Sequence, residues 1–441
     1  MTFDLIIHGG TLFTPGGEVA ADVGVRDGRI TAIGKLDPGQ AAEAIDAKHL
    51  TVLPGLIDEQ VHFREPGSTH KEDLESGTRG AVLGGITTVF EMPNTDPPTT
   101  NAAAIADKVR RGTGRCWTDF AFYVGASPEN ADQLGELERL PGCCGIKMFM
   151  GSSTGSLLVA DDENVARVLR SGSRRVTVHS EDDFRLQERA ALVAAGADVS
   201  MHPEWRDVET AVRSTRRLLA LAHKHGRRIH VLHVTTAEEM ALLAQHKDIA
   251  TVEVLPQHLT LAAPECYQKL GTLAQMNPPI REARHRDALW AALNSGVVDC
   301  IGSDHAPHTL EEKAKPYPRS PSGLTGVQTT VPVMLNHVAE GRLSLARLVD
   351  MLNAGPARIF GIAGKGRMAL GYDGDFTIVD LKAKRTITND WIASRTGWTA
   401  FDGMNVTGWP TATIIRGNVV MRDDQLLDKP IGAPVSFQET L

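Results

Sequence analysis

The stretch Asp58-Glu59-Gln60-Val61-His62-Phe63-Arg64-Glu65-Pro66-Gly67 follows a short apolar run, Val52 to Ile57. If that run is a β-strand, the two-residue period of side chains puts four polar residues on one face: Asp58, Gln60, His62 and Arg64. A histidine beside an arginine on a strand face is a metal ligand beside an anion binder. A single H-x-R is more often a polar strand end, so the interpretation depends on how the later strands end.

From residue 51 the chain alternates apolar runs with Ala- and Leu-rich helical stretches, a pattern that indicates parallel strands joined by helices. Eight such strands predict an α/β fold of the (β/α)8 TIM-barrel class, whose functional residues lie at the carboxyl ends of the strands. The eight predicted runs are Thr51–Phe63, Ile86–Pro93, Thr118–Gly125, Cys143–Met150, Arg174–Ser180, Arg227–Val234, Ile249–Pro256 and Val297–Asp304.

Seven of the eight predicted strands end in a residue that can bind a metal or an anion. Each one alone is better explained as a satisfied core or loop residue, but the whole set at one barrel mouth favours a functional site. The residues are His62 with Arg64, Asn94, Lys147, His179, His233, His258 and Asp304.

The two terminal segments differ from the barrel in pattern. Residues 1–50 and 364–441 contain short alternating runs separated by turn residues, and Asp27-Gly28 between two such runs is a strong hairpin signal. We therefore predict that both termini form one small β-rich domain, with the barrel at residues 51–363 between them.

The amino-acid composition and the net charge limit the classes of protein to which this chain can belong. The 441 residues are 42% hydrophobic and 23% charged, and the net charge of −8 lacks the basic clusters that a nucleic-acid partner requires. No segment approaches the roughly 20 apolar residues of a membrane span. Five cysteines without a C-x-x-C pattern are typical of reduced thiols, so we expect a cytoplasmic location.

Two motifs carry a resemblance to a known family. His62-Phe63-Arg64-Glu65-Pro66-Gly67, followed by Thr69 to Asp73, and Ser303-Asp304-His305-Ala306-Pro307-His308 resemble the motifs of dihydroorotases in the amidohydrolase superfamily. The usual form of the first motif is D-x-H-x-H-x-R-E-P-G. Gln60 stands where this form has its first histidine.

The resemblance implies a metal site that holds one or two Zn²⁺ ions through His62, Lys147, His179, His233 and Asp304, with Gln60 as a doubtful ligand. It also implies that a metal-bound hydroxide attacks a ring amide carbonyl while Asp304 accepts a proton and returns it to the leaving nitrogen. Lys147 would carry a carboxyl group from carbon dioxide; the alternative is a buried lysine paired with a carboxylate.

The resemblance also implies which residues bind substrate. Arg64 would bind a substrate carboxylate, because a guanidinium can donate two parallel hydrogen bonds to it. Its helpers would be Asn94, His308, Asn277, Ser322 and Gly323, although a turn asparagine and a glycine turn explain the last three almost as well.

Three further expectations concern single residues. His230 lies three residues before His233, so on a regular strand it should face outward and pack between barrel and helix. A carboxamide is a poorer zinc ligand than an imidazole, so Gln60 predicts a mononuclear site or a weakened binuclear one. His258 and His305 are expected behind the ligands rather than among them.

The implied activity is the reversible hydrolysis of (S)-dihydroorotate to N-carbamoyl-L-aspartate in pyrimidine biosynthesis. The alternatives are a related cyclic amidohydrolase (an allantoinase, hydantoinase or dihydropyrimidinase) and a non-catalytic relative that assists aspartate carbamoyltransferase. For all of these possibilities we expect a small-molecule ligand and a homo-oligomer.

Overall fold

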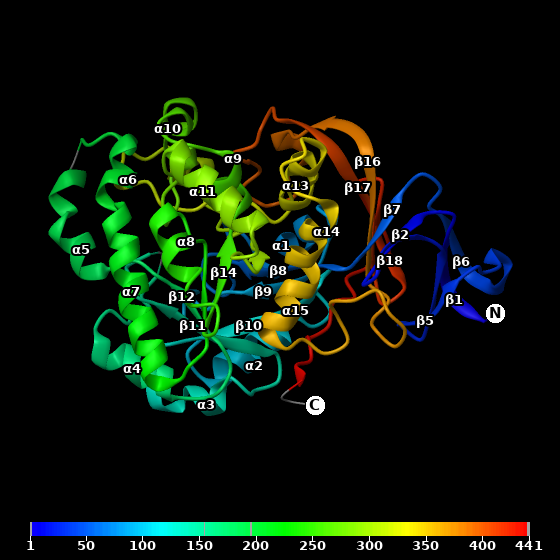
Figure 1. The fold of residues 1–441 in the computed structure, drawn as a ribbon, viewed down its shortest axis with the longest axis horizontal. Coiled ribbons are helices and arrows are strands. Elements are labelled where there is room, and N and C mark those ends of the chain that lie inside the picture. Colours follow the sequence, from blue (N-terminus) through cyan, green and yellow to red (C-terminus); the bar gives the residue numbers. More distant parts are fainter. Residues whose placement is uncertain (1, 154, 195, 439–441) are drawn as a thin grey trace.

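The computed structural model describes residues 2–153, 155–194 and 196–438. At its centre is an eight-stranded parallel sheet whose strands follow one another in chain order and curl into a barrel (Figure 1). The strands are β8 (Leu56–Val61), β9 (Ile86–Glu91), β10 (Asp119–Gly125), β11 (Cys143–Phe149), β12 (Val176–His179), β13 (Ile229–Val231), β14 (Ala250–Val254) and β15 (Cys300–Ile301).

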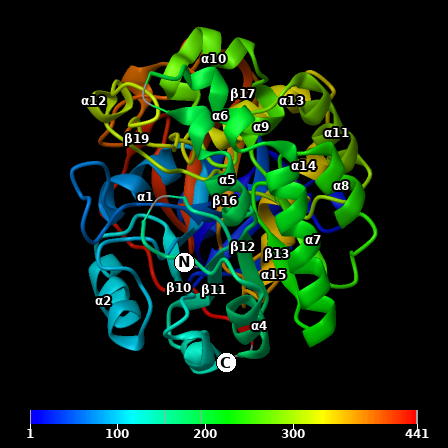
Figure 2. The same ribbon diagram turned by 90° about the vertical axis from the view of Figure 1, so that its left-hand side faces the viewer.

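Helices follow the strands and surround the barrel, which confirms the predicted (β/α)8 class (Figure 2). The outer ring contains α1 (Leu74–Leu83), α2 (Ala102–Gly112), α3 (Leu134–Leu137), α4 (Asp162–Arg170), α7 (Val208–His225), α8 (Ala237–Leu243), α11 (Ala283–Asn294), α13 (Thr330–Ala339), α14 (Leu345–Val349) and α15 (Gly355–Phe360). Shorter helices lie in the loops: α5 (Asp183–Glu188), α6 (His202–Trp205), α9 (Pro256–Thr260), α10 (Glu265–Leu270) and α12 (Leu310–Lys313). Among the described helices, none has both the length and the apolar character needed to cross a membrane.

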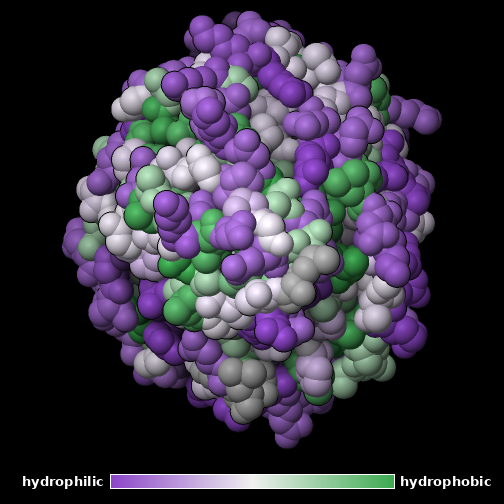
Figure 3. All heavy atoms as spheres, turned by 90° about the vertical axis from the view of Figure 1, so that its right-hand side faces the viewer, coloured by the Kyte–Doolittle hydropathy of each residue, from purple (hydrophilic) through white to green (hydrophobic). Residues whose placement is uncertain are grey.

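Both termini contribute to a β-rich region beside the barrel, as predicted (Figure 1). One sheet has the order β5-β4-β1-β6 and the other the order β19-β18-β17-β16-β7-β2-β3. Seen from outside, this end of the molecule mixes hydrophilic residues with smaller hydrophobic areas (Figure 3). The strands are β1 (Phe3–His8), β2 (Thr11–Thr14), β3 (Gly17–Ala20), β4 (Asp22–Arg26), β5 (Arg29–Gly34), β6 (Ala41–Asp46), β7 (Thr51–Pro54), β16 (Phe376–Thr386), β17 (Asn405–Ile415), β18 (Asn418–Arg422) and β19 (Gln425–Leu426).

The predicted first barrel strand is in fact two strands. Thr51–Pro54 forms β7, which pairs with β2 and β16 in the β-rich region, and only Leu56–Val61 belongs to the barrel. Gly55 separates them, and a Cβ built on it would lie 2.6 Å from Asp375 Cβ and from Thr87 Oγ1. A residue without a side chain is therefore needed where the chain passes from one sheet to the other.

The predicted hairpin at Asp27-Gly28 is confirmed. Arg26 pairs with Arg29 across the turn, and the two central residues have φ of 51° and 74°. Two consecutive positive φ angles define the type I′ turn, which matches the natural twist of a β-hairpin.

The barrel closes where β8 meets the segment that follows β15. His62 N donates a hydrogen bond to His305 O at 2.7 Å, and Val61 forms an isolated parallel bridge with His305. This seam places residues near position 60 beside residues near position 304, about 240 positions away in the chain.

The barrel has an apolar floor at the end opposite its carboxyl mouth. Phe360 and Phe437 pack inside with Phe90 and Tyr123, with ring centroids 5.3 to 6.4 Å apart. Phe437 comes from the last described segment, which runs along the barrel through backbone hydrogen bonds to Phe120. The last described residues thus close this end of the barrel instead of lying in the β-rich region.

A buried lysine joins the β-rich region to the barrel. Lys365 Nζ lies 2.7 Å from Asp119 of β10, 2.9 Å from Asp373 and 2.5 Å from Asp375, and its side chain is 7% exposed. One ammonium therefore compensates three carboxylates, with help from Arg416 at Asp119.

Replacing Lys365 with Met should lower the free energy of unfolding at pH 7 by about 3–5 kcal/mol, because it leaves buried carboxylates uncompensated. Burial alone would raise the pKa of Asp119, but Lys365 and Arg416 lower it below its ordinary value. In the wild type this stabilisation is present at neutral pH and is lost only below the ordinary pKa of an aspartate. In the variant the uncompensated buried carboxylates take up protons at a higher pH, so the deficit should shrink as the pH falls from 7 toward 4. Denaturant unfolding at pH 7 and at pH 4 measures the difference in unfolding free energy between the variant and the wild type. Lys384→Met, at an exposed lysine of β16, is the control. Equal stability of the Lys365 and Lys384 variants at pH 7 would contradict the role of Lys365.

Candidate active site

One pocket at the carboxyl ends of the strands collects nearly all of the side chains that the sequence singled out. Only His308 of the predicted site does not line this pocket, and it lies directly behind Arg64. The predicted residues that line it are Gln60, His62, Arg64, Asn94, Lys147, His179, His233, Asn277, Asp304, Ser322 and Gly323.

His62 presents a lone pair to Asp304. Its Nδ1 lies 2.8 Å from Asn94 Oδ1, which only accepts, so Nδ1 carries the proton and Nε2 does not. His62 Nε2 lies 3.1 Å from Asp304 Oδ1. Burial lowers the pKa of His62 despite the neighbouring Asp304, so two lone-pair donors face each other here.

His179 and His233 bring a second pair of ring nitrogens close together. His179 Nε2 donates to Glu181 Oε2 at 2.8 Å, which leaves the lone pair on Nδ1, 3.2 Å from His233 Nε2. Burial alone would raise the pKa of Glu181, but Arg206 and His179 hold it well below its ordinary value. Glu181 is therefore ionised, and it fixes the orientation and tautomer of His179.

Lys147 lines the same pocket in an unusual environment. Its Nζ is fully buried, has no hydrogen-bond partner among the described residues, and sits 4.6 Å from the centroid of the Phe149 ring. Burial lowers the pKa of Lys147 to about 7, although Asp304 and Glu253 act in the opposite direction. The structure therefore does not support the alternative of a direct ion pair between Lys147 and a carboxylate.

Arg64 is a buried cation that points into the pocket. It donates from Nε to Pro307 O at 3.2 Å and is 5% exposed, and burial lowers its pKa to about 10. Among the described ion pairs, none brings a carboxylate to Arg64. A buried guanidinium without an internal carboxylate is suited to bind an anionic ligand.

Gln60 takes a different position from the one expected of a metal ligand. Its Nε2 donates to Asp304 Oδ1 at 3.0 Å, the same oxygen that faces His62. Its Oε1 is buried without a partner among the described residues. Gln60 thus satisfies part of the hydrogen-bonding capacity of the Asp304 carboxylate.

The register of β8 explains why Gln60 lies beside Asp304. It also shows that the predicted alternation of side chains over positions 58 to 64 is wrong. The pairing of β8 with β9 shifts between Asp58 and Val61. Asp58 therefore accepts from the backbone of Gln60 and Ser303 outside the pocket, while Glu59 turns toward Cys300. The four residues at positions 58, 60, 62 and 64 do not share one face.

His230 also contradicts the prediction, because it faces the barrel interior. Its ring lies 5.7 Å from that of Phe360 on the barrel floor, and its Nε2 lies 3.6 Å from Cys300 Sγ. The reason is that β13 ends at Val231 and His233 has a φ of 36°, so strand alternation does not extend to His233.

Backbone strain concentrates at the pocket. Arg64, His233 and Asp304 have φ angles of 62°, 36° and 44°, values that residues other than glycine seldom adopt. Such conformations persist where the surrounding structure holds them, and they are commonly found at functional sites.

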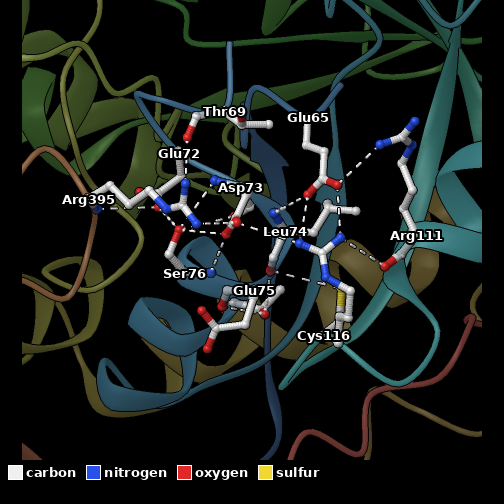
Figure 4. Close-up of polar contacts among 12 residues, drawn as sticks. Glu65, Thr69, Glu72, Asp73, Leu74, Glu75, Ser76, Arg111, Cys116 and Arg395 are labelled. Carbon is white, nitrogen blue, oxygen red and sulfur yellow. Dashed lines mark hydrogen bonds and ion pairs between the residues drawn. The ribbon is translucent and has the colours of Figure 1, made fainter. Parts of the chain in front are cut away.

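The acidic residues of the first motif anchor the loop that carries Arg64 (Figure 4). Glu65 accepts from Leu74 N at 3.0 Å and pairs with Arg115 at 2.8 Å, and Asp73 caps α1 by accepting from Ser76 N. Glu72 faces His305 Nε2 at 3.4 Å. His305 therefore lies behind the pocket, as expected.

The remaining predicted residues are held by specific contacts. His308 Nε2 donates to Ser322 O at 3.0 Å, and His308 Nδ1 accepts from Lys71 Nζ. Asn277 Oδ1 lies 3.0 Å from His202 Nε2. A Cβ on Gly323 would come within 2.3 Å of Ala306 O, so the close approach of the backbone requires glycine there.

Sequence reasoning missed several residues of the site. Phe149, Ser153 and Ala306 also line the pocket, and Glu181 with Arg206 supports His179. Phe149 could have been found, because it lies two positions after Lys147 on the same strand. Arg206 could not, because it comes from a loop far from His179 in the chain.

The donors present fit a bound metal ion. Separations of 3.1 Å between His62 Nε2 and Asp304 Oδ1 and of 3.2 Å between His179 Nδ1 and His233 Nε2 are close to the roughly 3.3 Å expected between two ligands of tetrahedral zinc. Neutral imidazoles, a carboxylate and an orphaned lysine supply the chemistry that such a site needs.

Comparison with known proteins shows the family to which the chain belongs. Residues 51–420 match the profile described as the amidohydrolase family. The chain is 36% identical to a dihydroorotase of Methanothermobacter thermautotrophicus over 93% of each chain, and 34% identical to an allantoinase of Escherichia coli over 96% of each. The L-hydantoinase (dihydropyrimidinase) structure from Arthrobacter aurescens superposes with a TM-score of 0.93 at 31% identity, covering 98% of this chain and 100% of that one.

Replacing Glu181 with Gln should weaken metal binding about 10- to 100-fold, because His179 loses the carboxylate that sets its tautomer. Competition with a chromophoric chelator measures the affinity. Exposed Glu188→Gln is the matched control. An unchanged affinity in Glu181→Gln would show that this carboxylate does not orient a ligand.

Proposed function

The chain belongs to the amidohydrolase family and is a cyclic amide hydrolase; from this premise we propose that its substrate is dihydroorotate. The reaction would be the reversible, zinc-dependent hydrolysis of (S)-dihydroorotate to N-carbamoyl-L-aspartate in pyrimidine biosynthesis. The position of Arg64 carries this proposal. Dihydroorotate bears a carboxylate on a cyclic ureide, and Arg64 is a buried cation at the pocket without a carboxylate partner among the described residues.

The substrate pose follows from the arrangement of the pocket. Arg64, held by Pro307 O and lying beside His308, would bind the carboxylate, and Asn277, Ser322 and Gly323 would contact the ureide edge. Asn94 would act through His62, which it orients. With the ring held at both ends, its amide carbonyl lies toward the histidine pairs.

Proton transfer would fall to Asp304. Its carboxylate faces the pocket beside His62 and can accept a proton from the attacking water and return it to the leaving nitrogen. Zinc held by His62, Lys147, His179, His233 and Asp304 would supply Lewis acidity and a more acidic water. Gln60 restrains Asp304 through its hydrogen bond.

Lys147 would act as a carboxylated lysine. A buried amine whose pKa is about 7 is partly neutral at physiological pH, and only the neutral amine attacks carbon dioxide. The product is an anionic carbamate, which would replace an uncompensated buried cation by a metal ligand.

The number of tightly bound zinc ions should be reduced by Gln60. Its amide donates to Asp304 and so offers a hydrogen-bond donor where an imidazole lone pair would otherwise be. We therefore expect that the site near His62 binds its metal weakly or not at all, whereas the His179 and His233 site retains it.

A second candidate activity is the hydrolysis of allantoin, which the 34% identity to an allantoinase over 96% of each chain supports. Allantoin has no carboxylate, so Arg64 would have no anion to bind. A non-catalytic partner of aspartate carbamoyltransferase is a weaker candidate, because every expected metal ligand except the residue at position 60 is present. Homo-oligomerisation and a cytoplasmic location stay predictions.

Replacing Arg64 with Met should lower kcat/KM for dihydroorotate by about 100-fold or more, since two charge-assisted hydrogen bonds are lost. Bound zinc, measured in the same samples, should not change. Arg110→Met, at a residue whose side chain is 72% exposed, is the control. Turnover of dihydroorotate at the wild-type rate by the Arg64 variant would refute the assigned role.

Replacing Gln60 with His should raise the zinc retained per chain after dialysis by about one ion, because an imidazole lone pair replaces an amide donor. Elemental analysis of both proteins measures the difference. Gln133→His adds a histidine at an exposed helix-loop position and should change nothing. Equal zinc content in the Gln60 variant and the wild type would contradict a metal site weakened by Gln60.

A further inference from the structure

We propose that Glu59, His230, Glu253 and Cys300 form a separate metal site inside the barrel, which takes zinc or a similar divalent cation. One donor atom from each of these residues lies within 4.8 Å of the others. All four side chains are fully buried, and none of them lines the pocket described above. The inference does not depend on the identity of the substrate.

The four residues converge from four different strands. Glu59 lies on β8, His230 on β13, Glu253 on β14 and Cys300 on β15. Strands β8 and β13 are not neighbours in the sheet, so His230 and Glu59 can meet only across the barrel interior. Cys300 Sγ lies 3.6 Å from His230 Nε2 and 2.7 Å from Glu59 Oε1, and His230 Nε2 lies 3.9 Å from Glu59 Oε1.

His230 is oriented as a metal-binding histidine is. Thr251 Oγ1 donates to Ile229 O at 3.3 Å, so it accepts from His230 Nδ1 at 2.9 Å. Nδ1 therefore carries the proton, and the lone pair on Nε2 points toward Cys300 and Glu59. A second hydrogen bond that fixes the tautomer in this way is typical of histidine ligands.

The two carboxyl groups lack the compensation that burial requires. Glu59 Oε2 and Glu253 Oε2 have no hydrogen-bond partner among the described residues, and the described ion pairs give neither residue a lysine or an arginine. Two facing carboxyl groups must share a proton or bind a cation.

The donor set selects the class of cation. A thiolate, an imidazole and carboxylates together suit zinc, whereas calcium and magnesium prefer oxygen ligands alone. Zinc would replace the thiol proton of Cys300, so the short contact between Cys300 Sγ and Glu59 Oε1 would lengthen by roughly 1 Å to the spacing of two zinc ligands.

A cation at this position would tie the barrel together at its seam. Glu59 belongs to the first barrel strand and Cys300 to the last, and among the described residues these strands meet through the bridge of Val61 with His305. Glu253 also accepts from His233 N at 2.9 Å through its Oε1. The site would therefore help to hold His233, which lines the pocket, in position from the barrel interior.

The test is cobalt substitution, because among the described residues no cysteine lines the pocket. Metal-free protein reloaded with Co²⁺ should show sulfur-to-cobalt charge-transfer absorption in the near ultraviolet. Cys300→Ser should abolish this absorption and lower the bound metal by one ion per chain. Cys144→Ser, at another buried cysteine of the barrel interior, and His179→Ala, in the pocket, should both retain it.

Zinc X-ray absorption of the unmodified protein provides a measurement that needs no variant. We expect a sulfur scatterer at about 2.3 Å, with fewer than one sulfur per zinc on average because none of the proposed pocket ligands contains sulfur. Absence of both the cobalt absorption and the sulfur scatterer in the wild-type protein would overturn the proposal in favour of a shared proton. Persistence of the absorption in Cys300→Ser would overturn it as well. Neither outcome depends on turnover of dihydroorotate, so this proposal can fail while the proposed activity stands.

Discussion

The contact on which the rest of the structure depends is the seam between β8 and the segment after β15. A backbone hydrogen bond of 2.7 Å from His62 N to His305 O marks this closure. The closure brings Gln60 and His62 to Asp304, and Arg64 to Pro307 and His308. The pair of residues that we propose as metal ligands and the arginine that we propose as the anion-binding group are thus products of one junction between distant parts of the chain.

Burial then determines the chemistry of the pocket. In water the imidazoles, Lys147 and Arg64 would all be hydrated, but inside the barrel each must be compensated or change its charge state. Neutral histidines with fixed tautomers and an amine with a pKa of about 7 are the result. Arg64 keeps its charge, since even its lowered pKa of about 10 lies well above neutrality. A pocket of lone-pair donors beside one persistent cation is suited to a substrate that is both an amide and an anion.

Much of this arrangement could be predicted from the sequence, because eight apolar runs with polar ends place their last residues at one barrel mouth. The errors arose where the backbone leaves its regular period. The register shift after Asp58 separates residues that strict alternation would keep together, and the early end of β13 turns His230 inward. Supporting residues such as Arg206 carry no local signal, since only the folded chain brings them to the site. The β-rich region was predictable from hairpin signals such as Asp27-Gly28, but the crossing of Thr51–Pro54 into its sheet was not.

We propose that donors gathered at this seam and after β12 and β13 hold a metal with which the protein hydrolyses a carboxylate-bearing cyclic amide. This proposal is tested most directly by assaying dihydroorotate hydrolysis and zinc content in the same purified sample, before and after chelation. We expect turnover that is lost with the zinc, returns when zinc is restored, and greatly exceeds turnover of the uncharged ureide allantoin. Fully metallated protein that leaves dihydroorotate unchanged would contradict the account.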